Sequence, residues 1–219
     1  MYRPGGSALN SGQVGDSRAA QFIAKKYSSS PVPVEKLMEK SRDIINSKIN
    51  LTNCFLKNIG STSNIQDTSR EIGDRMTKAG AQIRSLSSVQ NAITETLEDA
   101  ENIKFDARIA TIHSLPFAFQ NYDLLVTQYI YLCAIKNYIL SRGRSRGSYI
   151  IYSKDGTFPT DDLNEIFRFS LEDKLTDTVQ YVEYRNDHCI FNWQKVVPIK
   201  ERDTWFENIW SSYMKSEII

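Results

Sequence analysis

The stretch from Asn121 to Leu140 constrains the fold most, because apolar side chains recur along it every three or four residues without a glycine or proline. Its apolar positions are Leu124, Leu125, Tyr129, Leu132, Ile135, Tyr138 and Ile139. This spacing is typical of an α-helix with a wide apolar surface. We therefore expect a largely buried helix, which the rest of the chain must cover.

The same periodicity, together with start and stop signals, predicts further helices before and after this one. We expect them from Asp16 or Ser17 to about Tyr27, from Val34 to Asn50, over residues 66–79, over residues 87–103 with Ser87 or Ser88 as N-cap, and from about Arg202 to Lys215. Residues 51–64 are expected to hold a shorter helical turn and then a loop. In the last helix, Trp205, Ile209 and Trp210 are expected to face the body of the protein.

Beyond residue 140 the sequence becomes irregular and then β-rich. The basic, glycine-punctuated segment 141–148 and the turn residues Asp155-Gly156 and Pro159 predict irregular backbone. The runs 177–185 and 189–199 are rich in β-formers and separated by three polar residues. They predict a β-hairpin at about 177–198. The predicted fold is thus mainly α, a helical bundle with a small β-hairpin appendix near the C-terminus.

Composition excludes several classes of protein. The 219 residues are 41% apolar and 24% charged, which is ordinary for a globular protein, and 27 basic residues nearly balance 26 acidic ones. Bulk charge therefore does not point to nucleic acid or an anionic membrane. Cys54, Cys133 and Cys189 are widely spaced, which favours reduced thiols over a disulfide framework or a zinc site. No apolar run reaches the length of a membrane span or forms a signal-peptide core, so we expect a soluble, cytoplasmic protein.

Several titratable groups have simpler interpretations than catalysis. His113 and His188 lack partners at metal-ligand spacing, which favours structural or surface roles and no metal site. The pairs Asp161-Asp162 and Glu98-Asp99 are interpreted as helix-dipole partners rather than acid/base groups. The basic run 142–146 lacks interleaved aromatic residues, so a solvated or salt-paired break is favoured over a phosphate or RNA site.

The N-terminal segment 3–15 is glycine-rich and precedes the first predicted helix. It contains neither a GxGxxG fingerprint nor a GxxxxGK[ST] P-loop. Arg3, Gly5 and Gly6 nevertheless predict a loop whose amides lie at a helix N-terminus, where an anionic group is favoured. Spacing alone leaves both a ligand-binding loop and a plain N-terminal turn open.

Three segments resemble one known family when taken in order. YRPGGSALNSGQVGDSRAA, at residues 2–20, resembles the final segment of the flavin domain in the fumarate reductase, succinate dehydrogenase and L-aspartate oxidase flavoproteins. Residues 70–103 resemble helices of that family's C-terminal domain, with AGAQIRS standing where relatives have a Gly-x-x-Arg stretch. Residues 139–162 resemble the family's helix end and its ESRGAHxRxDxP motif, with Tyr149 in place of the histidine.

The resemblance implies that the chain is the C-terminal portion of an FAD-dependent oxidoreductase. Residues 1–30 would be a remnant of the FAD-binding domain, and residues 31–219 the helical C-terminal domain. By the resemblance, Arg3 binds a substrate carboxylate, and the backbone of Ala8 and Leu9 approaches the N1/O2 edge of the flavin. Gly5 and Gly6 would permit this approach, and Ser7 or Asn10 would substitute for a hydroxyl that relatives carry at the position of Ala8.

The GxGxxG segment, the ribose-binding acid and the capping domain of the family do not occur in this sequence. FAD would therefore bind only when an N-terminal FAD-binding polypeptide completes the site, and the isolated chain would be inactive. A small unsaturated acid is the implied substrate. One alternative is an autonomous helical protein-interaction module without redox activity. Another is a small nucleotide-binding domain that uses the glycine loop alone.

Overall fold

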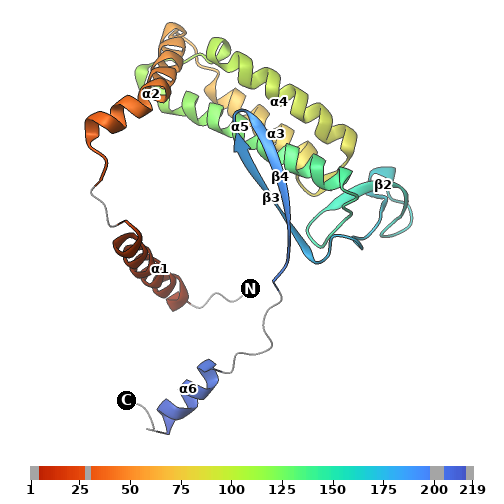
Figure 1. Cartoon of the computed structure of the whole chain (residues 1–219). Helices are drawn as coiled ribbons and strands as arrows, with labels where there is room; N and C mark the ends of the chain where they lie inside the picture. Colours follow the sequence, from red (N-terminus) through yellow and green to blue (C-terminus); the bar gives the residue numbers. More distant parts are fainter. Residues whose placement is uncertain (1–4, 28–30, 198–204, 216–219) are drawn as a thin grey trace. The chain divides into compact units, whose positions relative to one another are not determined.

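The computed structural model describes the backbone of residues 5–27, 31–197 and 205–215, and the side chains of residues 11–27, 31–197 and 208–215. The described chain is mainly helical with β structure toward its C-terminal end, which confirms the predicted fold class (Figure 1). It divides into two compact units, Met1–Leu51 and Thr52–Ile219. The division falls within the second helix, whereas the sequence suggests a boundary near residue 30.

The first unit contains α1 (Gly5–Lys26) and most of α2 (Val34–Lys57). The expected loop over residues 3–15 is wrong from Gly5 onward, because α1 begins there rather than at Asp16 or Ser17. A glycine inside a helix costs only about 1 kcal/mol relative to alanine, so glycines weaken a helix without forbidding it. At Gly12 and Gly15 an added Cβ would meet nothing within 4 Å.

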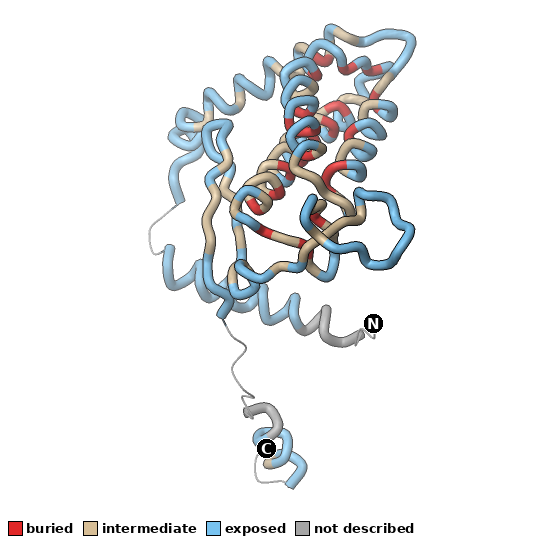
Figure 2. The backbone as a smooth tube through the Cα atoms, turned by 90° about the vertical axis from the view of Figure 1, so that its right-hand side faces the viewer, coloured by how far each residue is buried: buried red, intermediate tan, exposed pale blue. Residues whose placement is uncertain are grey.

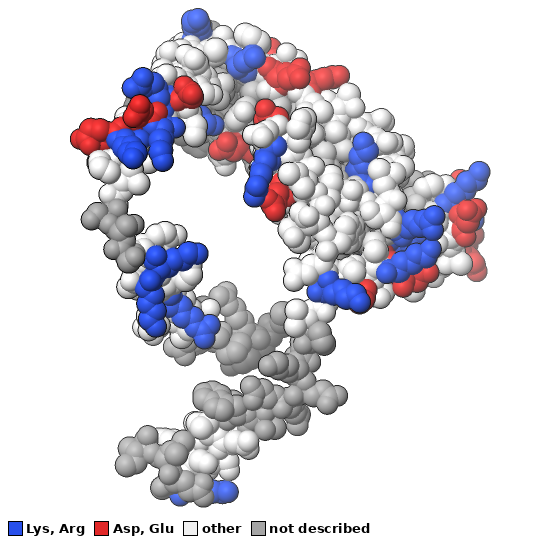
Figure 3. Space-filling view, viewed as in Figure 1, with Lys and Arg blue, Asp and Glu red and all other residues white. Residues whose placement is uncertain are grey.

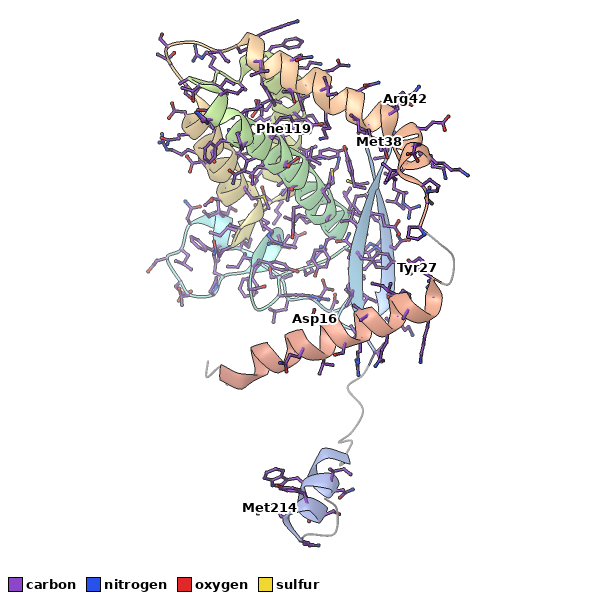
Figure 4. All side chains as sticks on the ribbon, turned by 90° about the vertical axis from the view of Figure 1, so that its left-hand side faces the viewer. Asp16, Tyr27, Met38, Arg42, Phe119 and Met214 are labelled. Atoms are coloured by element: carbon purple, nitrogen blue, oxygen red, sulfur yellow. The ribbon has the colours of Figure 1, made fainter. Side chains whose placement is uncertain are left out.

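None of the described residues from 11 to 51 is buried (Figure 2). Large apolar side chains are exposed on both helices; Phe22 is 54% exposed and Met38 is 53% exposed. Tyr27 follows the last turn of α1, and Met38 and Arg42 lie one turn apart on α2 (Figure 4). Basic and acidic side chains both lie on the surface of α2 (Figure 3). The described side chains of this unit therefore form no hydrophobic core.

The second unit is built on α3 (Ile65–Gly80), α4 (Leu86–Asp106) and α5 (Leu115–Leu140), the last preceded by the short 3-10 helix η1 (Ile112–Ser114). The buried residues of the chain concentrate on these three helices (Figure 2). On α5 they recur at three- and four-residue spacing: Ala118, Asn121, Leu125, Gln128, Leu132, Ile135 and Tyr138. Only this face is buried, because Tyr131 is 61% exposed. The expectation of a largely buried helix holds for one side of α5.

Amide side chains fix how α5 lies against α3. Asn121 Nδ2 donates to the Ile65 carbonyl at 2.8 Å, and Gln128 Nε2 donates to the Ile72 carbonyl at 2.7 Å. From the first of these bonds to the second, the donor and the acceptor each move seven residues toward the C-terminus, so α3 and α5 run parallel. Helix α4, which connects them in the chain, packs against both. Buried polar groups that are fully paired specify one alignment of packed helices.

Helix boundaries differ from the prediction where tertiary contacts set them. Ser85, rather than Ser87 or Ser88, is the N-cap of α4, and its hydroxyl accepts from the Ser88 N–H at 3.1 Å. In α2 no breaker follows Asn50, and the helix continues to Lys57. This extension places the Phe55 ring 5.3 Å from that of Phe119, which Figure 4 labels on α5.

Two small sheets complete the second unit. Strand β1 (Ile83–Arg84) pairs in parallel with β2 (Ile150–Thr157), so irregular backbone was the wrong expectation for residues 150–157. Strands β3 (Thr178–Arg185) and β4 (His188–Lys195) form the predicted antiparallel hairpin, confirming it. Its turn residues, Asn186 and Asp187, have φ of 49° and 60°, as tight hairpin turns require.

The hairpin packs on α5, where Gln180 Nε2 donates to Asn137 Oδ1 at 2.8 Å. A second 3-10 helix, η2 (Glu165–Phe167), lies between β2 and β3, and α6 (Trp205–Met214) follows the hairpin. On α6, Ile209 is 41% and Trp210 is 55% exposed, contrary to the expectation that they face the body. The side chain of Trp205 lies outside the described residues.

Candidate functional site

The N-terminal candidate residues lie in or just before the first turns of α1. Arg3 falls outside the described residues, as do the side chains of Ser7, Ala8 and Leu9, and the backbone from Gly5 to Leu9 is helical. The first N–H groups of an α-helix have no partner within it, and the candidate residues lie at this end of α1. The loop form expected of these residues is not adopted, and their contacts with substrate and flavin remain predictions.

The two C-terminal motif segments meet in space. Ile83 and Arg84, which belong to segment 70–103, pair with Ile150 and Ile151 of segment 139–162. The Arg84 guanidinium lies 4.1 Å from the centre of the Tyr149 ring. In the resemblance, Tyr149 stands where the flavoproteins have a histidine. Two segments that are far apart in the sequence thus meet near the C-terminal end of α5. We call the contact between residues 83–84 and 149–151 the junction.

Glu172 joins this junction to the end of α5 and is the most densely bonded carboxylate there. Its Oε2 accepts from the Tyr138 hydroxyl at 2.5 Å and from the Arg144 N–H at 2.6 Å. Its Oε1 accepts from the N–H groups of Lys174 and Leu175, both at 2.9 Å. Both oxygens therefore face donors only, an arrangement that suits an ionised carboxylate.

These contacts shift the pKa of both partners. Burial alone would raise the pKa of Glu172, but the hydrogen bonds from Tyr138 and from the backbone outweigh it and lower the pKa from 4.5 to about 2. Burial, and then the hydrogen bond to Glu172, raise the pKa of Tyr138 well above its usual range. Glu172 is thus an anion and Tyr138 a neutral hydrogen-bond donor throughout the physiological pH range.

Aromatic rings surround the Tyr138 side chain. Trp193 stacks on it at a centroid distance of 6.2 Å and an interplanar angle of 27°, and Tyr149 meets it edge-on at 6.1 Å. The Arg146 guanidinium lies 5.7 Å from its ring centre. An alanine Cβ at Gly143 would fall 2.4 Å from the ring, so this glycine permits the loop to cross it.

The segment 142–146 is solvated only at Arg142, which is exposed, and no ion pair of the described residues involves it, which corrects its interpretation for residues 143–146. Ser145 is buried, and its hydroxyl accepts from the Ile151 N–H at 2.8 Å. Arg146 is half-buried and donates to the Leu175 carbonyl. Within the part of the chain that the structure describes, no carboxylate lies within 4.0 Å of the Arg146 guanidinium.

A pocket of 480 Å³ opens at this junction. Among its lining residues are the two arginines of the junction and its three aromatic side chains: Arg84, Arg146, Tyr138, Tyr149 and Trp193. Burial lowers the pKa of Arg84, and the nearby tyrosines offset only part of this effect. The pocket therefore combines positive charge with flat apolar walls.

A second polar cluster lies inside the bundle. Arg75 donates to Glu95 Oε2 at 3.0 Å, to Asp99 Oδ2 at 2.5 Å and to Gln128 Oε1 at 3.1 Å, and the Thr96 hydroxyl shares that Gln128 oxygen at 3.0 Å. Asp99 lies in the middle of α4 and pairs with α3, so its interpretation as a helix-dipole partner is wrong. These bonds tie the three helices together.

The remaining candidates do not converge. His113 in η1 and His188 at the start of β4 are both exposed, as are Asp161 and Asp162, which precede η2 in a turn. Among the described residues, no three His, Cys, Asp or Glu side chains gather into a metal site. Cys133 on α5 and Cys189 on β4, which the sequence separates widely, lie close enough for each thiol to shift the pKa of the other, although burial is the largest cause of both shifts.

Comparisons with family models, curated proteins and solved structures find no match to this chain. In the described residues, no helix has the length and apolarity that a bilayer crossing requires. The junction of Arg84, Tyr138, Tyr149, Arg146 and Glu172 is therefore the candidate site on geometric grounds. Arg84, Arg146 and Tyr149 lie in segments that carry the family resemblance, but none of the three was predicted to be a site residue, and the sequence held no signal for Glu172.

Proposed function

We propose that this chain is the C-terminal portion of an FAD-dependent oxidoreductase similar to the fumarate reductase, succinate dehydrogenase and L-aspartate oxidase flavoproteins. It would act with an N-terminal FAD-binding polypeptide, in the cytoplasm. The observation that supports the proposal most is the contact between segments 70–103 and 139–162 through β1, β2 and the Arg84–Tyr149 stack. Each segment resembles a different part of the same family domain, and parts of one domain are expected to pack together.

The exposed first unit also supports a missing partner. Helix α1 carries Phe22 and Ile23 at 54% and 56% exposure, and none of its described side chains is buried. Isolated helices without tertiary packing are marginal in water, and contiguous exposed apolar surface is typical of interaction sites. In the proposal, a cofactor domain covers this surface.

The chemistry assigned to the N-terminal residues follows from the residue types. Arg3 would hold a substrate carboxylate through two parallel hydrogen bonds, which fix the orientation of the acid. Open N–H groups at the start of α1 would stabilise negative charge at the flavin N1/O2 edge. When bound, FAD supplies hydride exchange with the C=C bond of a small unsaturated acid.

The helical form of residues 5–15 sets a condition on this proposal. Gly5, Gly6, Gly12 and Gly15 together weaken α1 by about 4 kcal/mol relative to alanine, at about 1 kcal/mol each. Contacts with a cofactor domain are large enough to replace such a helix by the loop that the family uses. The glycines thus allow one segment to be helical alone and extended against a flavin.

To test the proposal, the chain is mixed with the FAD-binding and capping portion of an L-aspartate oxidase. That portion is truncated before the loop that residues 2–20 of this chain resemble. We expect the two polypeptides to co-elute and to retain flavin absorbance that neither retains alone. Arg3→Ala should keep the complex and lose turnover of an unsaturated dicarboxylate. An upstream reading frame encoding GxGxxG would supply the natural partner for the same assay. Absence of a flavin-containing complex with either partner would refute the proposal.

A helical interaction module without redox activity is the second candidate, favoured by the helical form of α1 at the glycines. The double substitution Gly5→Ala, Gly6→Ala distinguishes the helical interaction module from the flavin-contacting loop. Alanine strengthens a helix, so partner binding by a helical module should persist or improve. A flavin-contacting loop needs the close backbone approach that only glycine allows, so flavin retention should fall.

A further inference from the structure

The pocket at the junction lies entirely within the second unit and has the size of a small-molecule site. Its volume of 480 Å³ falls within the range of ligand pockets in proteins. It lies between the C-terminal half of α5, the hairpin and β1, all of which are described. Three different parts of the fold therefore hold its walls in place.

The two guanidinium groups in this pocket have donors to spare. Arg84 uses Nε to bond the Ala81 carbonyl at 2.8 Å, and Arg146 uses Nη2 to bond the Leu175 carbonyl. A guanidinium carries five N–H donors. Over the described ranges, neither group has a carboxylate within ion-pair distance. Half-buried cations without a counter-charge are costly, and an entering anion would relieve that cost.

Aromatic rings orient both cations and form the walls beside them. Arg84 stacks on Tyr149 at 4.1 Å, and Arg146 lies over Tyr138 at 5.7 Å. Trp193 stacks on the Tyr138 ring. Flat apolar walls contribute binding energy only to a ligand with an apolar body, whereas an inorganic anion would use the charges alone.

We propose that this pocket binds a small organic acid with a flat apolar body, its carboxylate held by Arg84 and Arg146. The planar fork of each guanidinium matches a carboxylate. The rings of Tyr138, Tyr149 and Trp193 provide the surface for the apolar body. This assignment rests on residues 76–193 and does not depend on flavin binding, so it stands or falls separately from the proposed function.

Benzoate is the probe, and Trp193 is the reporter. The chain has three tryptophans, so Trp205→Phe with Trp210→Phe leaves Trp193 alone in the full-length protein. We expect benzoate to change its fluorescence saturably, with a Kd of about 1 mM or lower. Benzamide, which has the same ring without the charge, and inorganic phosphate, which has charge without the ring, should each bind roughly tenfold more weakly. Calorimetry on the unsubstituted protein checks the fluorescence result.

Arginine variants connect binding to the named groups. Arg84→Gln and Arg146→Gln should each weaken benzoate binding roughly tenfold or more. Arg185→Gln removes the same charge from an exposed ion pair with Glu183 on the same hairpin and should leave binding unchanged. Because Arg84 also anchors β1, circular dichroism checks folding. If Arg84→Gln unfolds, Arg84→Lys, which keeps the charge and loses the fork, takes its place.

Three results would overturn the assignment. The first is absence of saturable benzoate binding to the folded protein. The second is equal or tighter binding of benzamide or phosphate, since the pocket would then not select an organic acid. The third is benzoate binding that Arg146→Gln leaves intact or that Arg185→Gln weakens to the same extent.

Discussion

Replacing Glu172 with glutamine should destabilise the second unit although the side chain keeps its shape. Glu172 accepts four hydrogen bonds, two at each oxygen, from Tyr138 and from three backbone N–H groups. The amide nitrogen of glutamine is itself a donor, so whichever way the amide turns it would face at least one backbone N–H group, from which it cannot accept. Glutamine has nearly the same shape as glutamate, so packing is unchanged. The loss of stability therefore reports the loss of the carboxylate alone.

The magnitude follows from the pKa. Lowering the Glu172 pKa from 4.5 to about 2 corresponds to about 3 kcal/mol of folding free energy at neutral pH, and solvent at this half-buried site reduces it to about 1–2 kcal/mol. A carboxyl whose pKa is lowered by folding contributes fully above pH 4.5, and the contribution is lost as the pH falls through 2. The difference between Glu172→Gln and the unsubstituted protein should therefore shrink by about half at pH 3.

Urea unfolding at pH 7 and pH 3, followed by circular dichroism, measures this difference. Glu165→Gln is the matched control, because the Glu165 side chain is 69% exposed and its Oε1 lies 3.8 Å from Nη2 of Arg168. An exposed pair of this kind contributes at most about 0.5 kcal/mol. If Glu172→Gln were as stable as Glu165→Gln at pH 7, or if its deficit stayed constant down to pH 3, the role given to the ionised carboxylate would be wrong.

Three further outcomes follow from local geometry. Gly143→Ala should cost about 1–3 kcal/mol in urea unfolding because its Cβ would press on the Tyr138 ring, whereas Gly147→Ala, with open space around it, should cost far less. Burial raises the pKa of Cys189 from 9 to about 11, so its alkylation rate should rise with a midpoint near pH 11, and a midpoint near 9 would contradict its packing. Gly12→Ala with Gly15→Ala should raise helicity in far-UV circular dichroism, since each alanine favours α1 by about 1 kcal/mol and meets open space; unchanged helicity would mean that residues 5–26 are not helical in solution.

Helical periodicity predicted the bundle because side chains on one helix face recur at fixed spacing wherever they are buried. Helix ends were less predictable where a tertiary contact decides them. The run of serines at 85, 87 and 88 offers several caps, and Ser85 is chosen because β1, just before it, pairs with β2. The same pairing makes residues 150–157 a strand, although no local pattern there distinguishes a strand from a loop.

The candidate site was predictable in part for a similar reason. Arg84 and Tyr149 lie in segments whose motifs stand out in the sequence. Glu172 lies in an unremarkable polar stretch, and its importance arises because donors from α5, the 142–146 segment and its own loop converge on it. Only the fold brings these groups together, so sequence patterns carry no signal for them.

The contrast between the two units bears on how this chain would work. In the second unit, paired amides, an ionised carboxylate and a ring stack fix each element against another. In the first unit, four glycines weaken α1, and no described side chain is buried. A segment with little stability of its own changes conformation at small cost when a partner binds it. A weakly stable N-terminal segment beside a well-packed second unit is compatible with the proposal that another polypeptide supplies the remaining parts of a site.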